Sequence, residues 1–251
     1  MKLKDGKFTE RSIKMSEETK KEINTNAEGE NKQVKKVVHG LIEKLVDKIA
    51  INTLGRIVPS FVTPNMMTAF GAIGGLFGIV CAFLAKIHPL FLIGTCFGVC
   101  THMICDSLDG YIARKRNISS KAGAYFDLLT DILHLTYLLI ALAFSNVIDI
   151  RIVIFLVPVY ALIIFTSMNE IHYLNVFSFP TLGPNETQLF FIALLVGSMI
   201  TGCKPLFEIK GFGVKFGDIA ALVGGIPMYF EMIRLQITIF NRIKKQEQEE
   251  E

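Results

Sequence analysis

Six apolar segments, each followed by a short polar or charged stretch, constrain the fold of this chain more than any other feature. They comprise residues 66–85, 90–113, 122–144, 150–168, 187–201 and 216–240. A helix needs about 20 apolar residues to cross the hydrocarbon core of a bilayer, and it satisfies its backbone hydrogen bonds internally. The composition agrees, because 51% of residues are hydrophobic, only 20% are charged, and the mean hydropathy is +0.45. We therefore predict an all-α polytopic membrane protein with six transmembrane helices.

The segments before and after these spans are polar. Residues 1–35 are rich in Lys, Glu and Asn and lack apolar periodicity, which predicts a disordered cytosolic tail without a cleavable signal peptide. In residues 36–62, apolar residues recur at helical spacing between charged ones, which predicts a juxtamembrane amphipathic helix on the membrane surface. A coiled-coil partner helix is the alternative for this segment. Residues 63–241 then form the six-helix membrane domain, and residues 242–251 form a charged cytosolic tail.

Four aspartates lie within the second and third spans, where acidic residues are not expected. Read as helices, the two spans each place their aspartates on one face together with small residues: Asp106, Asp109, Gly110 and Ala113 on the first, and Gly123, Asp127 and Asp131 on the second. The polar segment 115–122 joins the two helices, so we expect a hairpin with these faces opposed. Such a hairpin would place four carboxylates around one point.

The chemistry of these residues indicates a metal site for a diphosphate. Carboxylates at membrane depth are costly, and like charges a few ångströms apart repel each other, so bound divalent cations would relieve both costs. Ligation by oxygen alone suits Mg²⁺ or Mn²⁺, and four carboxylates could hold two such ions. The small residues leave room for a ligand against the backbone, and Arg114 adds a positive charge suited to phosphate.

This pattern resembles the motif of the CDP-alcohol phosphotransferase family, D-x2-D-G-x2-A-R-x8-G-x3-D-x3-D, at every defined position. The resemblance implies a membrane enzyme that transfers a substituted phosphate group from a CDP-linked donor to an alcohol and releases CMP. At least one of the two substrates is then a lipid. The family also makes a homodimer an expected assembly, although no residue here identifies an interface.

The resemblance also implies roles for individual residues. By position, Asp106, Asp109 and Asp127 are metal ligands for two divalent cations, Mg²⁺ or Mn²⁺, and Asp131 is the general base, which also shares a metal. The nucleotide-binding residues implied by the family are Gly110, Ala113, Arg114 and Gly123, with Arg114 holding phosphate. Asn65 follows Pro64 at the start of the first span, and it either touches the nucleotide or only caps the helix. His134, three residues after Asp131, either faces the site or is a packed, hydrogen-bonded residue.

The distribution of charge predicts the orientation of the site. Arg114, Lys115, Arg116 and Lys121 lie just beyond the acidic faces, and the positive-inside rule assigns such a cluster to the cytosol. We therefore expect the site to face the cytosol, with both termini on the same side. Because the formal net charge is only +3, a nucleic-acid partner is not expected.

The identity of the transferred group depends on weaker signals. Gly183, Pro184, Asn185 and Glu186 resemble the Gly-Pro-Thr-Glu of the choline/ethanolamine phosphotransferase branch, with Asn185 in place of Thr, and this makes Glu186 a candidate acceptor residue. The chain departs from that branch between Asp127 and Asp131 and in its number of spans. No basic cluster in the fourth and fifth spans suits a phosphorylated acceptor, which favours an aminoalcohol or an uncharged headgroup. Both CDP-diacylglycerol with a polar alcohol and CDP-choline or CDP-ethanolamine with diacylglycerol remain open.

A function of a different class also accounts for carboxylates inside a membrane. Divalent-cation transporters use such groups, but they scatter them over several spans, often in repeats. In this chain the aspartates lie in two consecutive spans, with small residues and Arg114 at fixed offsets. The transporter is therefore the alternative to the enzyme.

Overall fold

The computed structural model describes residues 35–37, 58–174, 176–178, 184–209 and 211–250. The described part is built from long helices, each containing one predicted span: α3 (Pro64–Leu84), α4 (Phe91–Lys115), α5 (Lys121–Phe144), α6 (Ile150–Leu174), α7 (Pro184–Ile200) and α8 (Phe216–Glu250). Of these, α3, α4, α5 and α8 are long and apolar enough to cross a membrane. The apolar parts of the other two are shorter, Ile150–Thr166 and Asn185–Ile200. The prediction of an all-α polytopic membrane protein is confirmed.

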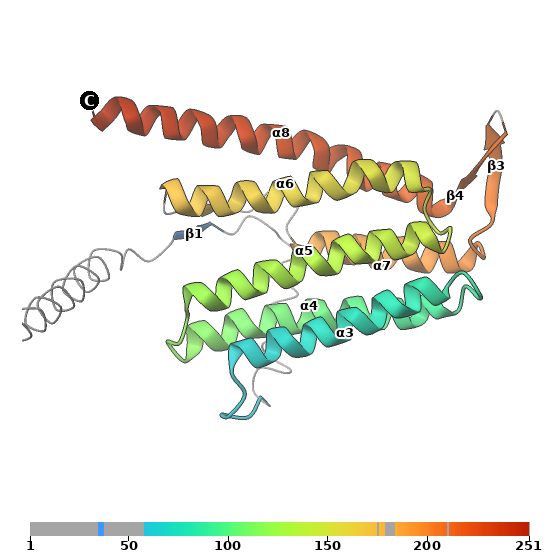
Figure 1. The fold of residues 1–251 in the computed structure, drawn as a ribbon, viewed down its shortest axis with the longest axis horizontal. Coiled ribbons are helices and arrows are strands. Elements are labelled where there is room, and N and C mark those ends of the chain that lie inside the picture. The colour runs from blue at the N-terminus through green and yellow to red at the C-terminus, as the bar shows by residue number, and fades with distance from the viewer. Residues whose placement is uncertain (1–34, 38–57, 175, 179–183, 210, 251) are drawn as a thin grey trace, which may run out of the picture.

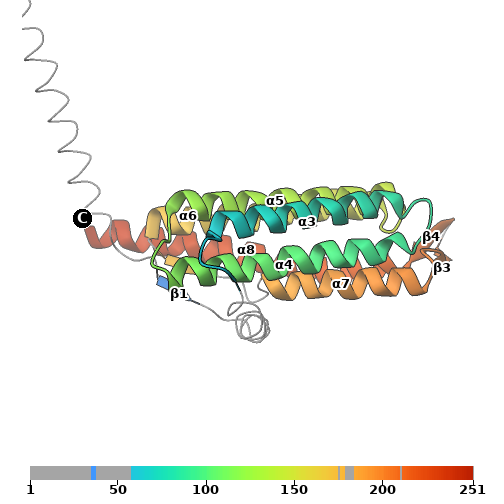
Figure 2. The same cartoon turned by 90° about the horizontal axis from the view of Figure 1, so that it is seen from below.

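The helices lie lengthwise beside one another (Figures 1 and 2), and their contacts form a closed ring. Going around it, α3 packs on α4, α4 on α7, α7 on α8, α8 on α6, α6 on α5, and α5 again on α3. The acidic helices α4 and α5 each approach α3 more closely than they approach each other. The helix α3 therefore packs against both helices of the predicted α4–α5 hairpin and separates them.

A hydrophobic core fills the half of the ring that lies away from the aspartates. Its fully buried side chains come from the beginning of α4 and the ends of α5 and α7, and they include Leu92, Leu138, Leu139, Leu142, Leu194 and Leu195. Burying an aliphatic side chain stabilises a fold by about 1.5–3 kcal/mol in water, and inside a bilayer close packing takes over this role. The core holds the far ends of α4 and α5 in a fixed relation, so the polar ends of the same helices are positioned as well.

Glycines bring α3 and α4 into backbone contact. A Cβ atom on Gly98 would lie 2.5 Å from the Cα atom of Gly78, and a Cβ atom on Gly71 would lie 2.8 Å from the Cβ atom of Cys105. Small residues at such positions allow two helices to approach closely, which increases van der Waals contact in lipid. This contact sets the distance between the site residues on α3 and those on α4.

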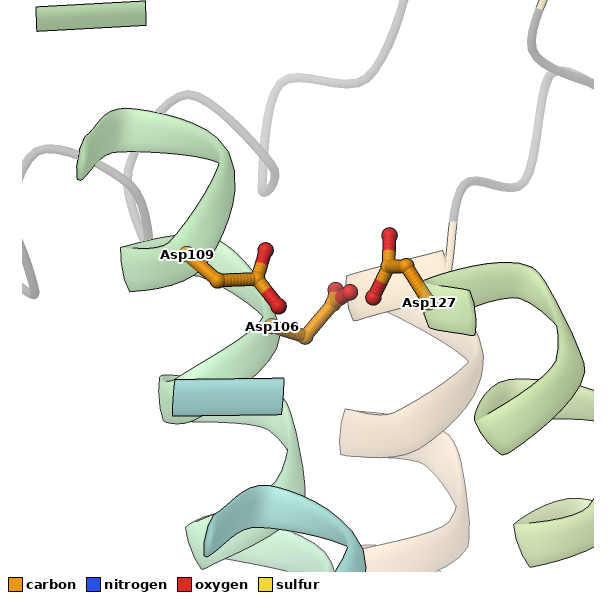
Figure 3. A group of neighbouring side chains, drawn as sticks. All are labelled: Asp106, Asp109 and Asp127. Atoms are coloured by element: carbon orange, nitrogen blue, oxygen red, sulfur yellow. The ribbon is translucent and has the colours of Figure 1, made fainter. Parts of the chain in front are cut away.

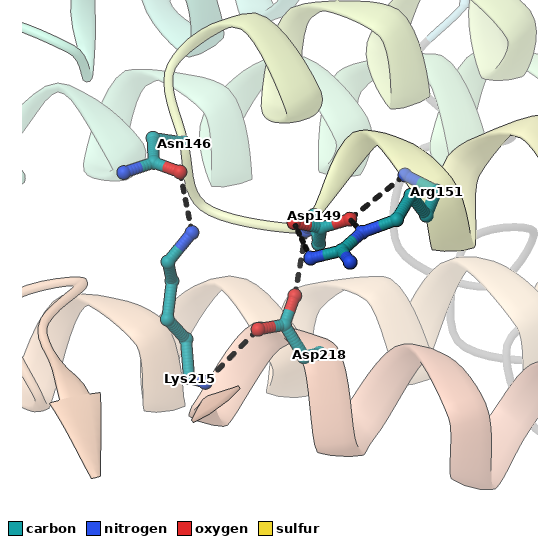
Figure 4. A network of polar contacts seen from close by, with 5 residues as sticks. All are labelled: Asn146, Asp149, Arg151, Lys215 and Asp218. Atoms are coloured by element: carbon teal, nitrogen blue, oxygen red, sulfur yellow. Dashed lines mark hydrogen bonds and ion pairs between the residues drawn. The ribbon is translucent and has the colours of Figure 1, made fainter. Parts of the chain in front are cut away.

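A polar network closes the ring at the end opposite the site (Figure 4). Asp218, in the first turn of α8, accepts hydrogen bonds from the backbone N–H of Lys215 at 2.9 Å and of Asp149 at 2.6 Å. The Lys215 ammonium donates to the side-chain oxygen of Asn146, and the Arg151 guanidinium donates to Asp149 at 2.8 Å. The hydrogen bond from Arg151 holds the pKa of Asp149 below its ordinary value. The network joins the α5–α6 turn to the start of α8 and satisfies backbone groups that a helix end leaves free.

Several connections differ from the predictions. The helix α6 continues to Leu174 into a stretch predicted as a polar loop, and α8 continues to Glu250 through the predicted charged tail. The residues added to α8 are mostly Arg, Lys, Gln and Glu, which are good helix formers, whereas those added to α6 include the apolar Ile171 and Leu174. The stretch between the fifth and sixth predicted spans contains an antiparallel hairpin of β3 (Pro205–Ile209) and β4 (Phe212–Lys215).

The structure leaves most of the predicted N-terminal elements outside its described residues. The undescribed residues of this region are 1–34, which are nearly all of the predicted tail, and 38–57, which are most of the predicted amphipathic helix. At the start of that segment, β1 (Lys35–Val37) pairs in parallel with β2 (Val176–Ser178), which follows α6. Lys36 and Val37, the first residues of the predicted amphipathic helix, therefore lie in a short strand.

Candidate active site

Three of the four predicted aspartates meet at one end of the ring. Asp106 and Asp109 come from α4 and Asp127 from α5, and Asp106 lies between the other two (Figure 3). One carboxylate oxygen from each lies within 4.8 Å of the others. Two ionised carboxylates this close repel, so the arrangement requires a shared proton or a cation.

The donor set fits a hard divalent cation. Three converging carboxylates, without His or Cys, offer the oxygen ligands that Mg²⁺ and Mn²⁺ both accept. Asp109 is buried, and its orientation is held by the hydroxyl of Thr68 on α3, which donates a hydrogen bond to Oδ2. Hydrogen bonds of this kind fix ligand geometry and make metal binding tighter.

Asp131 stands apart from this group. It lies one turn further along α5, about 6 Å along the helix axis, toward the hydrophobic core. Its Oδ1 atom is 3.8 Å from Nε2 of His102 on α4, and the ring of His102 stacks on that of His134. Three of the four predicted carboxylates thus converge, and the fourth, Asp131, faces a histidine.

Asn65 and the small residues lie at the same end of the ring. The side-chain oxygen of Asn65 is 3.1 Å from the position that a Cβ atom on Gly123 would occupy, so Asn65 lies directly over Gly123. Thr63 caps α3 by accepting a hydrogen bond from the N–H of Met66 at 3.3 Å. The helix cap is thus Thr63, and the Asn65 side chain is available to a ligand at Gly123.

Comparison with known proteins gives a clear family assignment. Residues 61–225, more than half of the chain, match the model of the CDP-alcohol phosphatidyltransferase family. The chain belongs to this family. It is thus a membrane enzyme that transfers a substituted phosphate group from a CDP-linked donor.

Comparisons with individual proteins add little. The chain is similar to the crystal structure of Mycobacterium tuberculosis phosphatidylinositol phosphate synthase with CDP-DAG bound, with 17% sequence identity and a TM-score of 0.44. That similarity covers 80% of this chain and 92% of the other. No curated protein matches the chain significantly by sequence.

In this member of the family, Arg114 folds back over its own helix. Its Nη1 atom lies 3.0 Å from the position that a Cβ atom on Gly110 would occupy, and its head is exposed. Ala113, beside it on α4, is half-buried. The small residue at position 110 therefore makes space for the guanidinium as well as for a ligand.

Arg116 belongs to the predicted basic cluster but has a structural partner. Its guanidinium donates hydrogen bonds to the backbone carbonyls of Pro59 at 3.0 Å, Ser60 at 3.0 Å and Val62 at 2.5 Å. This clamp holds the chain segment that leads directly into Thr63 and Asn65. Arg116 thus links the α4–α5 connection to the start of α3.

Glu186, the predicted acceptor residue, is not among the three converging carboxylates. It lies in the first turn of α7, which packs on α4. Its neighbour Asn185 is 4% exposed, and the Oδ1 atom of Asn185 has no hydrogen-bond partner within the described part of the chain. The start of α7 thus contributes a buried polar group on a helix that packs on α4.

His102 and Thr68 are the residues that sequence reasoning missed. A signal for His102 was present, because His102, Asp106 and Asp109 follow the helical spacing i, i+4 and i+7 on α4. No comparable signal pointed to Thr68, because its partner Asp109 is 41 residues away in sequence. His134, by contrast, was considered, and it is buried against His102.

Proposed function

We propose that this enzyme catalyses metal-dependent transfer of the phosphate-linked group of a CDP donor to an alcohol hydroxyl, releasing CMP, at the site formed by Asp106, Asp109, Asp127 and Asp131. The observation that carries the proposal is the division of the four carboxylates. Three converge within 4.8 Å, as metal ligands do, and Asp131, one turn further along α5, is not among them. A separate carboxylate is suited to proton transfer rather than to metal binding.

In this mechanism Asp106, Asp109 and Asp127 hold one or two divalent cations. When bound, such cations neutralise the diphosphate and stabilise the charge that develops on the leaving CMP. Asn65, Gly110, Ala113 and Gly123 receive the nucleotide, and the exposed guanidinium of Arg114 pairs with a phosphate oxygen.

Asp131 acts as the general base. As the hydroxyl oxygen of the acceptor forms its bond to the distal phosphorus, the bond from that phosphorus to the oxygen of CMP breaks. The hydroxyl proton passes to a carboxylate oxygen of Asp131. The Oδ1 atom of Asp131 is buried and has no hydrogen-bond partner among the described residues, so the carboxylate is not committed to another ligand.

The acceptor side favours an aminoalcohol or uncharged headgroup. Between Arg151 at the far end of α6 and Lys204 after α7 the sequence contains no Lys or Arg, so a phosphorylated acceptor would find no cation on these helices. Glu186 and the buried Asn185 at the start of α7 are the candidate acceptor residues. Exposed Arg114 and Lys115 at this end of the ring support a site that opens to the cytosol.

Release of CMP by the purified protein in lipid tests the function. The donors compared are CDP-diacylglycerol with a panel of polar alcohols, and CDP-choline and CDP-ethanolamine with diacylglycerol, each with Mg²⁺ and Mn²⁺. Asp131→Asn is the blank, and Lys244→Gln, at an exposed position near the end of α8, is the matched control. CMP release by wild type and by the Lys244 variant only would support the proposal, and the active donor identifies the transferred group. Absence of CMP with every donor would contradict it, and uptake of Mn²⁺ into vesicles would then support the transporter.

A further inference from the structure

A buried polar layer lies directly beneath the carboxylate group. It consists of Asp131 on α5, His134 one turn further along the same helix, and His102 on α4. The two histidines are 3% and 8% exposed, and their rings stack with centroids 4.1 Å apart and an interplanar angle of 24°. Two buried imidazoles in contact would repel if both were charged, so the stack favours neutral rings.

Gly75 of α3 packs against the two histidines of this layer. A Cβ atom on Gly75 of α3 would lie 2.8 Å from Cδ2 of His134 and 3.1 Å from Cδ2 of His102. Any side chain at this position would meet the imidazole pair. The missing side chain of Gly75 therefore allows the two rings to stack between α3, α4 and α5.

The layer contains polar atoms without hydrogen bonds. Within the described part of the chain, Nδ1 of His102, Nε2 of His134 and Oδ1 of Asp131 have no hydrogen-bond partner. Buried polar groups without a partner are costly, so such atoms call for an explanation. Nε2 of His102 lies 3.8 Å from Oδ1 of Asp131, slightly beyond hydrogen-bond length. Hydrogen bonds at catalytic groups are often long in free enzymes and shorten when substrate binds.

We propose that His102 is a positioning residue for Asp131. A neutral His102 with its proton on Nε2 donates to Oδ1, which turns Oδ2 of Asp131 toward the acceptor hydroxyl. His134 contributes its ring surface, which holds the plane of His102. The inference rests on the proposed function, because it assigns to His102 the orientation of the proposed base.

Variants that separate the ring from the donor test this role. His102→Phe keeps an aromatic ring for stacking but removes Nε2, whereas His102→Gln removes the ring but places an amide N–H near the same point. Thr95→Val is the matched control, since it changes another buried polar residue of α4 that has no assigned role at the site. The readouts are kcat and KM for CMP release, Tm, and the rise in Tm produced by Mn²⁺ in the absence of substrate.

We expect kcat of His102→Phe to fall about 10- to 100-fold, as is typical when a supporting hydrogen bond is lost. The KM for the CDP donor and the Mn²⁺-dependent rise in Tm should change less than about threefold, because the three metal-holding aspartates are untouched. His102→Gln should recover most of the lost kcat, and Thr95→Val should stay close to wild type.

The results that would overturn the role of His102 differ from those that would overturn the proposed function. Wild-type kcat in His102→Phe, or equal losses in the Phe and Gln variants, would overturn the role of His102 as a donor. A large fall in Tm that follows kcat across the variants would assign His102 to packing and would also overturn it. If His102→Phe does not fold, His102→Leu makes the same comparison against His102→Gln. Failure of the proposed function itself would appear differently, as absence of CMP release by wild type or as full activity of Asp131→Asn.

Discussion

The hydroxyl of Thr68 donates a hydrogen bond to Oδ2 of Asp109 across the contact between α3 and α4. Both residues are buried, and the same hydroxyl lies 3.2 Å from the carbonyl oxygen of Pro64 in its own helix. A helix that supplies no carboxylate to this group of three aspartates therefore orients one of them. The glycine contact between α3 and α4 supports the same geometry, because it sets the distance that this hydrogen bond spans.

Replacing Thr68 should weaken metal binding. Thr68→Val preserves shape but removes the donor, and we expect the Mn²⁺ concentration for half-maximal activity to rise about 10-fold, since a supporting hydrogen bond to a ligand is lost. Thr95→Val is the control, because Thr95 is a buried threonine of α4 that bonds only to a carbonyl of its own helix in the described contacts. An unchanged Mn²⁺ requirement in Thr68→Val would show that Asp109 is held by other contacts.

Asp106 and Asp131 should respond differently to metal. Without cations the grouped carboxylates repel, so Asp106→Asn should match or exceed the Tm of wild type in EDTA but gain little from added Mn²⁺. Asp131→Asn should keep the Mn²⁺-dependent rise in Tm while kcat falls about 10²- to 10⁴-fold, as expected for loss of a general base. Thermal unfolding with and without Mn²⁺, together with CMP release, measures both effects. Loss of the Mn²⁺ response in Asp131→Asn would make Asp131 a metal ligand.

Two glycines of α4 should differ in their effect on stability. Gly98→Ala puts a methyl group against the backbone of Gly78, and such overpacking destabilises by about 1–3 kcal/mol, which lowers Tm. Gly110→Ala meets only the movable, exposed head of Arg114, so Tm should change little while the KM for the CDP donor rises. Thermal unfolding in detergent distinguishes them, and equal Tm values for the two variants would contradict this account of the α3–α4 contact.

Arg116 should affect nucleotide binding through the chain segment that it holds. Arg116→Gln loses donors to the carbonyls of Pro59, Ser60 and Val62, and this loosens the approach to Asn65. We expect the KM for the CDP donor to rise about 3- to 10-fold, equivalent to roughly 0.6–1.4 kcal/mol of binding, with a smaller change in kcat. Lys115→Gln removes a neighbouring charge that lies over the Tyr111 ring, and it serves as the control for charge alone. Equal KM increases in both variants would assign the effect to charge.

The polar network at the end opposite the site, which contains Asp149 and Arg151, predicts a pH dependence of stability. The hydrogen bond from Arg151 lowers the pKa of Asp149 in the folded state, so its stabilisation is present above the unfolded pKa, about 3.9, and is lost as the pH falls through the folded value. Arg151→Gln should therefore lower Tm at pH 7, and its Tm should approach that of wild type below about pH 4. A Tm difference that stays constant from pH 7 to pH 3 would contradict this coupling. Lys244→Gln controls for the loss of one positive charge.

Much of the site could be predicted from local sequence. The spacing of Asp106 and Asp109 on one helix and of Asp127 and Asp131 on the next follows from 3.6 residues per turn, and the structure has both helices where they were expected. The ends of helices were less predictable. The helix α8 extends through polar sequence, because Lys, Arg, Gln and Glu form helices readily, and α6 extends through residues 169–174, where Ile171 and Leu174 continue its apolar sequence.

The sequence by itself determined the helices, the apolar spans, the family and the faces on which the aspartates lie, because these properties depend on residues within a few turns of one another. Only the tertiary structure decided that three carboxylates converge while Asp131 faces His102, that Thr68 holds Asp109, and that Arg116 clamps the entry to α3. These contacts join residues on different helices or distant segments. Their geometry depends on how closely α3 approaches α4 and α5, and the packing of glycines and the far-end core sets that distance.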